Sequence, residues 1–182
     1  WFDHSNVIYD AEAVFAARGI TQQQLNGTPM SAEEAANMLK EEMALAAYAD
    51  SVVSVSDSES LTFRKHGVDR VHVLGHVLPA APTGRSFHER NGFLFAGAMR
   101  EETSPNVDSI IWFVQEVFPM IQAGLDSEIT LTIAGDNNLE RVRQLAGPSV
   151  RVIGRLPDLT ELYDSSRVFV APTRYAAGIP HK

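Results

Sequence analysis

Apolar and polar residues alternate along this chain in short runs, and their spacing predicts strands and helices in turn. The clearest run is residues 92–99 (GFLFAGAM), a nearly continuous apolar segment typical of a strand buried on both faces of a parallel sheet. Residues 128–134 (EITLTIA), 150–153 and 167–171 (RVFVA) have the same character. Because helical spacing separates these runs, the second half of the chain predicts a parallel α/β sheet with right-handed crossovers.

Helix signals between these strands are local and specific. Ser104 followed by Pro105 predicts a helix start, with serine as the cap and proline in the first turn. Apolar residues then recur every three or four positions as far as Leu125, and Pro119 inside this run predicts a kink or a division of the helix. Shorter helices are predicted over residues 139–145 and 159–163.

The first half of the chain predicts a second, smaller set of alternating elements. The spacing of Ser31 and Glu34 is that of a capping box, so a helix is expected from about Ala32 to Ala49. The other expected elements are a strand at 6–9 (NVIY), a helix entered at Asp10 and ending near Arg18, a strand at 51–56, a helix capped by Ser56 or Asp57 and ending near Lys65, and a strand at 71–74.

A segment rich in proline, glycine and charge divides the chain. It is PAAPTGRSFHERNG, residues 79–92, and it is the best linker in the sequence. We therefore expect a first α/β domain over 1–80, a linker over 81–91 and a second α/β domain over 92–182. The chain opens on Trp1 and stops in a loop, so we expect both domains to be partial and the chain to be cut from a longer protein.

Composition excludes several classes of function. The 182 residues include 15 basic and 23 acidic side chains, a net charge of −8, which disfavours non-specific binding to nucleic acid. There is no cysteine, so a disulfide framework and a thiolate nucleophile are excluded. No apolar run approaches the roughly 20 residues that span a bilayer, and no signal peptide opens the chain. We expect a cytoplasmic protein, or one at the inner face of a membrane.

Motifs for other chemistries are missing or weak. The sequence contains no GxGxxG, no GxxxxGK[ST] and no GxSxG, which are the central loops of dinucleotide oxidoreductases, P-loop NTPases and serine hydrolases. His72 and His76 have no third metal ligand nearby, so packing or surface positions are the favoured interpretation and no metal site is predicted. The aromatic residues of the second half are interpreted as core rather than as a platform for sugars: Phe93, Phe95, Trp112, Phe113 and Phe118.

Three segments carry a resemblance to a known family. They are FLFAGAMREETSPNVDSIIWFVQEVFP, LTIAGD and VRVIGRLPDLTELYDSSRVFVAPTRYAAGIPHK, and they resemble the donor-binding half of a retaining glycosyltransferase of the GT-B fold, the family numbered four or glycosyl transferases group 1. The segments VIYDAEAVFAAR, SVVSVSDSE and VHVLGHVLP resemble, more weakly, the last part of that family's acceptor domain. The fold class implied is α/β with two partial Rossmann-like, doubly wound parallel sheets.

The resemblance also implies an activity. A sugar would pass from a nucleotide-diphosphate donor to an acceptor hydroxyl, with retention of configuration and with the donor bound between two Rossmann-like domains. The acceptor would be a glycan, a lipid-linked molecule or a small molecule, and peripheral contact with a membrane is compatible with it. The nucleotide sugar is a substrate, so neither a cofactor nor a metal ion is expected. The alternative is a non-catalytic Rossmann-like module that binds a nucleotide or a protein.

Breaking the glycosidic bond leaves negative charge on the diphosphate, which fixed cations and backbone amides stabilise. Arg100 follows the 92–99 strand at the ligand-binding edge of the sheet, and the resemblance implies that Arg100, Gly97 and Lys182 contact the phosphates. The lysine that the family places near Pro105 is missing, and Lys182 or Arg174 is expected to compensate. The alternative for Arg100 is an ordinary solvated loop charge.

A second set of residues is expected to lie along the nucleotide. Its members are Gly135, Ile153, Gly154, Arg155, Tyr175 and Gly178. Gly135 is alternatively a turn glycine, and residues 153–155 are alternatively a tight turn after a strand. Tyr175 either stacks on a ligand or fills the core.

The acidic residues leave the chemistry incomplete. Many family members carry two glutamates eight residues apart, and the first position falls here at Ala176 or Ala177. Asp10 and Glu12 follow a strand and could face the acceptor, although helix capping by Asp10 and a solvated Glu12 are favoured. Retaining enzymes of this fold have no agreed protein nucleophile, so no catalytic residue is assigned.

Overall fold

The computed structural model describes residues 6–82, 84–125 and 128–179. They form two compact units, residues 6–79 together with 175–179, and residues 80–174. The sequence placed residues 175–179 in the second domain, whereas in the structure they contact the first unit. Each unit has its own parallel sheet and its own buried apolar core.

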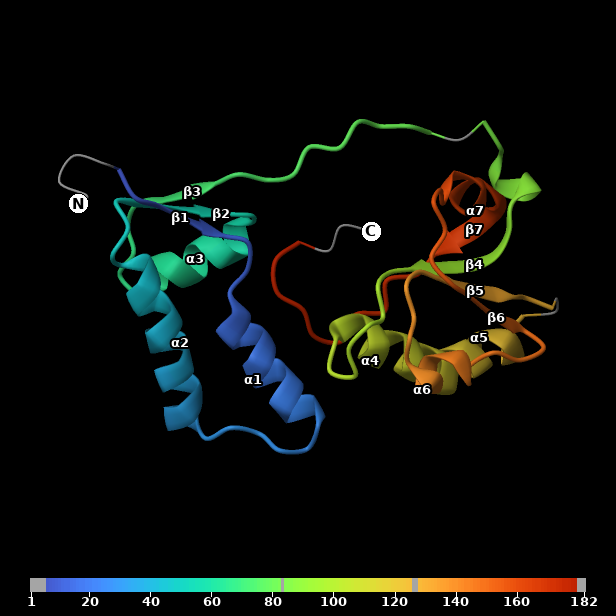
Figure 1. The fold of residues 1–182 in the computed structure, drawn as a ribbon, viewed down its shortest axis with the longest axis horizontal. Helices are drawn as coiled ribbons and strands as arrows, with labels where there is room; N and C mark the ends of the chain where they lie inside the picture. The colour runs from blue at the N-terminus through green and yellow to red at the C-terminus, as the bar shows by residue number, and fades with distance from the viewer. Residues whose placement is uncertain (1–5, 83, 126–127, 180–182) are drawn as a thin grey trace. The chain divides into compact units, whose positions relative to one another are not determined.

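The first unit is built on a three-stranded sheet in the order β1-β2-β3. Its elements are β1 (Ile8–Ala11), α1 (Phe15–Leu25), α2 (Ala32–Ala46), β2 (Ser51–Ser54), α3 (Asp57–Lys65) and β3 (Val71–Val73). Figure 1 shows α1, α2 and α3 on the same side of this sheet. Val52 of β2 and Phe63 of α3 are fully buried between the sheet and the helices, in the apolar core of this unit.

The first helix begins later than the sequence predicted. Asp10 does not cap it but lies within β1, opposite Val53 of β2. Helix α1 begins at Phe15, and its first amides are satisfied from distant parts of the chain: Glu42 accepts hydrogen bonds from the N–H groups of Phe15 and Ala16 at 2.8 and 2.7 Å. The helix start is therefore fixed by a carboxylate of α2, a partner that local sequence signals do not report.

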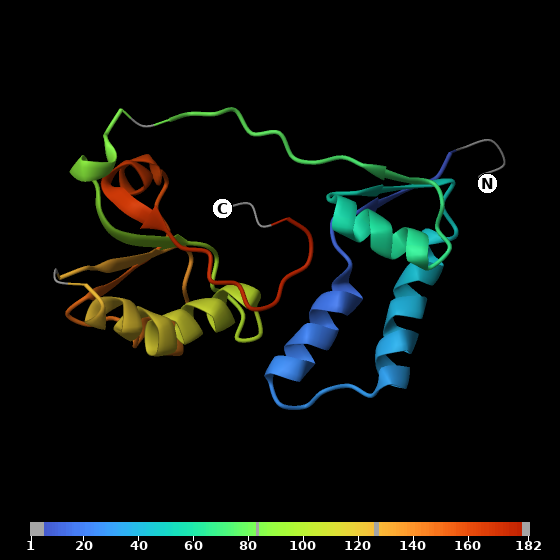
Figure 2. The same cartoon turned by 180° about the vertical axis from the view of Figure 1, so that it is seen from behind.

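The second unit is a doubly wound sheet in the order β6-β5-β4-β7. Its elements are η1 (Phe87–Glu89), β4 (Asn91–Ala96), α4 (Pro105–Trp112), the π-helical turn η2 (Phe113–Val117), α5 (Phe118–Ala123), β5 (Leu131–Ala134), α6 (Glu140–Arg143), β6 (Val150–Ile153), α7 (Thr160–Ser165) and β7 (Ser166–Phe169). Figures 1 and 2 show α4, α5 and α6 on one face of the sheet and α7 on the other. The strand order reverses between β4 and β7, the arrangement that places ligands at the carboxyl ends of Rossmann-like strands.

Several local predictions for the second unit are confirmed. Helix α4 begins at Pro105, and the Ser104 hydroxyl caps it by accepting a hydrogen bond from the Val107 N–H at 3.3 Å. The predicted interruption at Pro119 appears as the π-helical turn η2 followed by α5. Proline has no N–H to continue the regular ladder, so the turn before it widens. Phe95, Phe113 and Phe118 are buried in the core, as expected.

Candidate functional site

Three glycines meet at the carboxyl edge of the second sheet, where β4, β5 and β6 end. The Gly97 N–H donates to the carbonyl oxygen of Ala134 at 3.0 Å, and the Gly135 N–H donates to that of Gly154 at 3.3 Å. Gly135 has a φ of 133°, and a Cβ there would lie 2.0 Å from the Gly97 carbonyl oxygen. Only glycine fits at this approach of two strand ends. The structure thus brings together Gly97, Gly135 and Gly154 at one edge; their roles in nucleotide binding remain predictions.

Arg100 stands at the same edge and is oriented by a partner that the sequence analysis missed. Its Nε lies 2.7 Å from Oδ2 of Asp136, while 60% of the Arg100 side chain is exposed. The Met99 N–H donates to the Asp136 carbonyl oxygen at 2.7 Å, which ties the two loops together. Arg100 is therefore neither a free solvated charge nor a buried one: its guanidinium is oriented and still accessible.

Asn137 is the second residue of this edge that sequence reasoning missed. Its Nδ2 donates to the carbonyl oxygens of Gly135 and Ile153, at 3.1 and 3.0 Å. These bonds brace the ends of β5 and β6 and engage backbone groups of the segment that was predicted to lie along the nucleotide. The signal available in the sequence was the polar run Asp136, Asn137, Asn138 directly after an apolar strand.

Arg174, which was considered as a substitute cation, has its charge paired within the second unit. Its Nε donates to Oδ2 of Asp108 at 2.9 Å, and its NH2 group contacts the other carboxylate oxygen. The guanidinium also lies 5.6 Å from the centre of the Trp112 ring. The Arg174–Asp108 ion pair is mostly buried and joins the loop after β7 to α4 through two contacts. Arg100 is therefore the more accessible of the two arginines.

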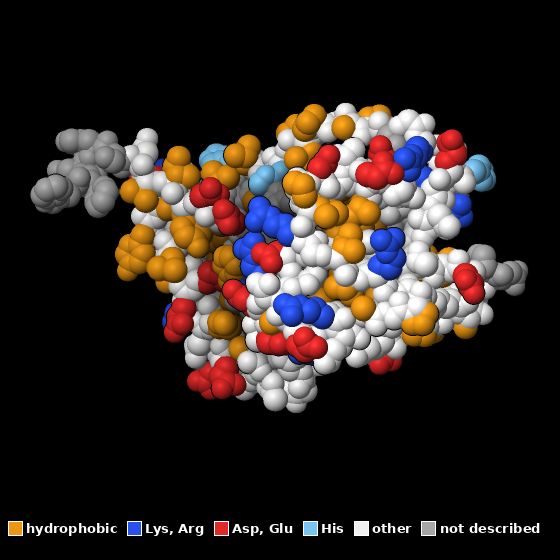
Figure 3. Space-filling model, turned by 45° about the vertical axis from the view of Figure 1, so that its right-hand side comes forward, with side chains coloured by type: hydrophobic (Ala, Val, Ile, Leu, Met, Phe, Trp, Pro, Cys, Tyr) orange, Lys and Arg blue, Asp and Glu red, His pale blue; other side chains and the backbone are white. Residues whose placement is uncertain are grey.

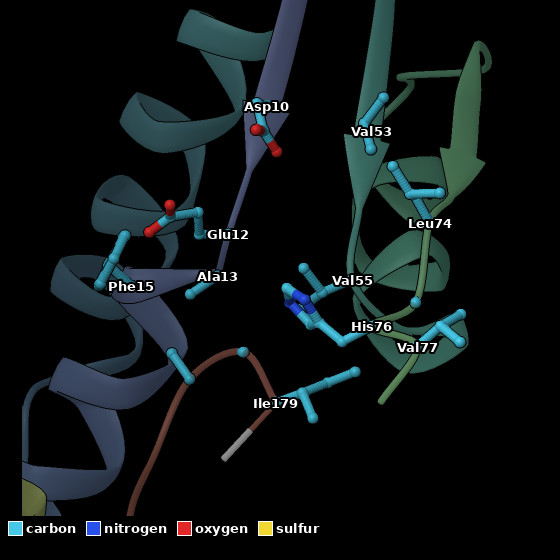
Figure 4. A pocket seen from close by; sticks show the side chains of 13 residues that line it. Asp10, Glu12, Ala13, Phe15, Val53, Val55, Leu74, His76, Val77 and Ile179 are labelled. Atoms are coloured by element: carbon cyan, nitrogen blue, oxygen red, sulfur yellow. The ribbon is translucent and has the colours of Figure 1, made fainter. Parts of the chain in front are cut away.

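The first unit has a cavity of about 720 Å³ at the carboxyl ends of its strands. Residues from β1, β2 and the segment after β3 line it, including Asp10, Val53 and Leu74. Figure 4 shows the His76 imidazole extending toward Ala13 across this cavity. Asp10, predicted to face the acceptor, lines the cavity with Glu12, although the Glu12 carboxylate is directed toward Phe15 and away from His76.

Residues 175–179, hereafter the 175–179 loop, close one side of this cavity through Ala177, Gly178 and Ile179. Tyr175 is 5% exposed, and its hydroxyl accepts a hydrogen bond from Gln22 Nε2 at 3.1 Å. A buried ring with a bonded hydroxyl fits the core alternative for Tyr175, while its contact with a nucleotide stays a prediction. Lys182, predicted to contact phosphate, lies outside the described residues.

Three further features concern surface charge, groups of metal-ligand side chains and helix length. On the face shown in Figure 3, the described lysine and arginine side chains lie among aspartate and glutamate side chains. Among the described residues, no three histidine, aspartate or glutamate side chains are grouped as metal ligands. No helix in the described ranges has the length and apolar character needed to cross a bilayer.

The two parallel sheets, with ligand-type edges at the carboxyl ends of their strands, define an α/β protein of the Rossmann-like class. The model of the family described as glycosyl transferases group 1 matches residues 90–182. The chain belongs to this family, which confirms the resemblance found in the sequence. No curated protein matches it.

Two solved structures show the same fold. The match to the crystal structure of TarM has 11% sequence identity and a TM-score of 0.57, and it covers 76% of this chain and 28% of the TarM chain. A second match is to an S. aureus TarM mutant in complex with Fondaparinux, alpha-GlcNAc-glycerol and UDP. It has 11% sequence identity and a TM-score of 0.58, and it covers 78% of this chain and 28% of the mutant's chain. The chain therefore spans little more than a quarter of the length of either structure.

Proposed function

We propose that this protein transfers a sugar from a nucleotide-diphosphate sugar to an acceptor hydroxyl, with retention of configuration, and that residues 90–182 bind the donor. The observation that carries the proposal is the position of Arg100 at the carboxyl edge of a sheet that belongs to the group 1 glycosyl transferases, where Asp136 orients it at 2.7 Å. The proposal includes no metal ion and no cofactor.

The chemistry of the leaving group explains why this arrangement suits the donor. A nucleoside diphosphate gains negative charge as its bond to the sugar breaks, and an oriented guanidinium stabilises that charge without reorganising at the moment of reaction. Asp136 engages Nε of Arg100, so the pair fixes the direction of a side chain that is still 60% exposed. UDP in the TarM complex supports a nucleotide ligand for this fold.

The acceptor is proposed to bind on the first unit. The cavity of this unit lies at the carboxyl ends of β1, β2 and β3. Its lining includes the hydrogen-bonding side chains of Asp10 and His76 and apolar side chains such as Val53 and Leu74. Such a surface suits a hydroxyl-bearing acceptor with apolar faces. The TarM mutant structure is a complex with alpha-GlcNAc-glycerol, a hydroxyl-bearing molecule.

Calorimetry with UDP, GDP, ADP and dTDP tests the donor site. We expect at least one to bind, and we expect Arg100→Ala to weaken that binding by about tenfold or more, because a charge-assisted hydrogen bond contributes about 1.5–3 kcal/mol. Arg151→Ala is the matched control, since Arg151 is an exposed arginine near the amino end of β6, away from the carboxyl edge. If the folded chain binds none of the four, the non-catalytic alternative is favoured; if both variants bind as the unaltered chain does, Arg100 is not in the site.

A further inference from the structure

The motif S-x-x-E occurs three times at helix starts in this chain, and one copy behaves differently. Glu34 accepts a hydrogen bond from the Ser31 N–H at 2.8 Å, and Glu89 accepts one from the Ser86 N–H at 2.6 Å. Both therefore return to their own cap residue, as capping boxes do. At the start of α3 the Ser56 hydroxyl does accept from the Glu59 N–H, at 3.3 Å, but the Glu59 carboxylate points elsewhere.

The Glu59 carboxylate joins two segments that are far apart in the sequence. Its Oε1 accepts hydrogen bonds from the Val14 N–H at 3.1 Å and from the Gly178 N–H at 2.9 Å. Val14 is in the turn between β1 and α1, and Gly178 is in the 175–179 loop. The other oxygen, Oε2, is buried and accepts no hydrogen bond in the part of the chain that the structure describes. The Glu59 carboxylate therefore does not complete its own capping box. It binds two distant amides instead, one just before α1 and one in the 175–179 loop.

The 175–179 loop is shaped to fit against this turn. Gly178 has a φ of 72°, and a Cβ at this position would lie 2.5 Å from the carbonyl oxygen of Glu12. Tyr175 anchors the beginning of the loop through its buried ring and its bond to Gln22. Glu59 thus supplies a polar attachment for a segment whose backbone already lies in contact with the turn.

The loop also separates two cavities. Ala177 and Gly178 border the cavity of about 720 Å³ at the strand ends, and the same two residues border a second cavity of about 270 Å³, which Glu59 and Thr62 also line. The position of the loop therefore determines where the wall of the larger cavity stands.

We infer that Glu59 is a positioning residue that fixes the 175–179 loop as a wall of the cavity at the carboxyl ends of β1, β2 and β3. Its contacts are to backbone amides, so it acts through the loop and not on a ligand. The consequence for sugar transfer rests on the proposed function: the acceptor is proposed to bind in this cavity, and a loop held in this position keeps the cavity wall in one conformation, which lowers the ordering cost of binding.

Hydrogen exchange at single amides tests the inference directly. In Glu59→Ala we expect the Val14 and Gly178 amides to exchange about tenfold faster or more, since a hydrogen bond to a charged group is lost at each. Glu59→Gln keeps one acceptor oxygen and should restore protection at both amides. Glu34→Ala is the matched control, because it breaks a capping box of the same motif in the same unit and should leave both amides protected.

A change on the loop side keeps the test decisive if Glu59→Ala does not fold. Gly178→Ala places a Cβ against the Glu12 carbonyl while Glu59 is intact; we expect faster exchange at residue 178 and unchanged protection at Val14. Unchanged exchange at residue 178 in both variants, or a loss in Glu34→Ala equal to that in Glu59→Ala, would overturn the inference.

Binding of UDP, GDP, ADP and dTDP to the same variants separates this inference from the proposed function. If the unaltered chain binds none of the four, the proposed function fails, while the exchange pattern still decides the role of Glu59. If a diphosphate binds, we expect Glu59→Ala and Glu59→Gln to change its affinity by less than about twofold, because the loop lines the cavity of the first unit and the donor is proposed to bind at Arg100. A loss of about tenfold or more in Glu59→Ala, with normal affinity in Glu59→Gln, would contradict the assignment of the loop to this cavity alone.

Discussion

At the scale of single residues, the proposed donor site at the carboxyl edge of the second sheet depends on the close approach of the loops after β4 and β5. Gly135 follows β5 and Gly97 follows β4, and the carbonyl oxygen of Gly97 occupies the space where a side chain of residue 135 would begin. Arg100 and Asp136, the pair that orients the proposed phosphate ligand, follow these two glycines in the sequence. Backbone approach and guanidinium orientation are thus parts of one arrangement.

Gly135→Ala is expected to destabilise the second unit by about 3 kcal/mol or more, because the positive φ is unfavourable for alanine and the Cβ collides with backbone. Gly147→Ala is the control: a Cβ there meets no atom within 4 Å, so a change within about 1 kcal/mol is expected. Urea unfolding of both variants measures the difference. Equal free energies of unfolding would mean that the strand ends can separate at little cost.

At the scale of elements, the boundaries that local signals define were predictable. The capping box of Ser31 and Glu34 begins α2 at Ala32, and the Ser104 cap begins α4 at Pro105, as the sequence indicated. Strand β6 has the predicted bounds, 150–153. In each case the residues that decide the boundary are a few positions apart.

Boundaries and pairs that depend on distant residues were not predictable. Helix α1 begins at Phe15 because Glu42 accepts its first amides, and Arg100 is oriented by a residue 36 positions away. Tyr175 is buried by contacts with a segment more than 150 residues earlier. A single sequence gives residue types and spacings, and these contacts exist only once the fold has brought the segments together.

The start of α2 makes a prediction about pH. Hydrogen bonds from Ser31 lower the pKa of Glu34 below its ordinary value of 4.5. A carboxylate with a lowered pKa stabilises the folded form above that ordinary value, and the stabilisation is lost as the pH falls through the lowered pKa. Glu34→Gln keeps an acceptor for the Ser31 N–H but does not titrate.

We therefore expect the melting temperature of the unaltered chain, relative to Glu34→Gln, to fall as the pH is lowered from 7 to below 4.5. Circular dichroism at the helix band measures it. Glu33→Gln, a neighbouring carboxyl that makes no hydrogen bond within the described residues, controls for net charge. A difference between the unaltered chain and Glu34→Gln that stays constant with pH would contradict the assignment.

At the scale of the whole molecule, the chain has two separate cores. Phe63, Val52 and Met43 belong to the core of the first unit, whereas Phe95 and Ile133 belong to that of the second. Residues 74–82, which include the boundary between the two units at 79 and 80, are exposed and contain neither helix nor strand. A chain divided in this way can lose one core without losing the other, because the burial that stabilises each sheet is local to its own unit.

Phe63→Ala and Phe95→Ala form a matched pair that tests this division, since both side chains are fully buried, one in each core. Each is expected to cost about 3–5 kcal/mol, from lost burial and the cavity left behind. Hydrogen exchange reads the units separately: Phe63→Ala should reduce the protection of β2 amides and leave β5 unchanged, and Phe95→Ala should do the reverse. Loss of protection in both sheets from either change would show that the two units fold as one cooperative body, and the donor half could then not be studied by changes confined to its own core.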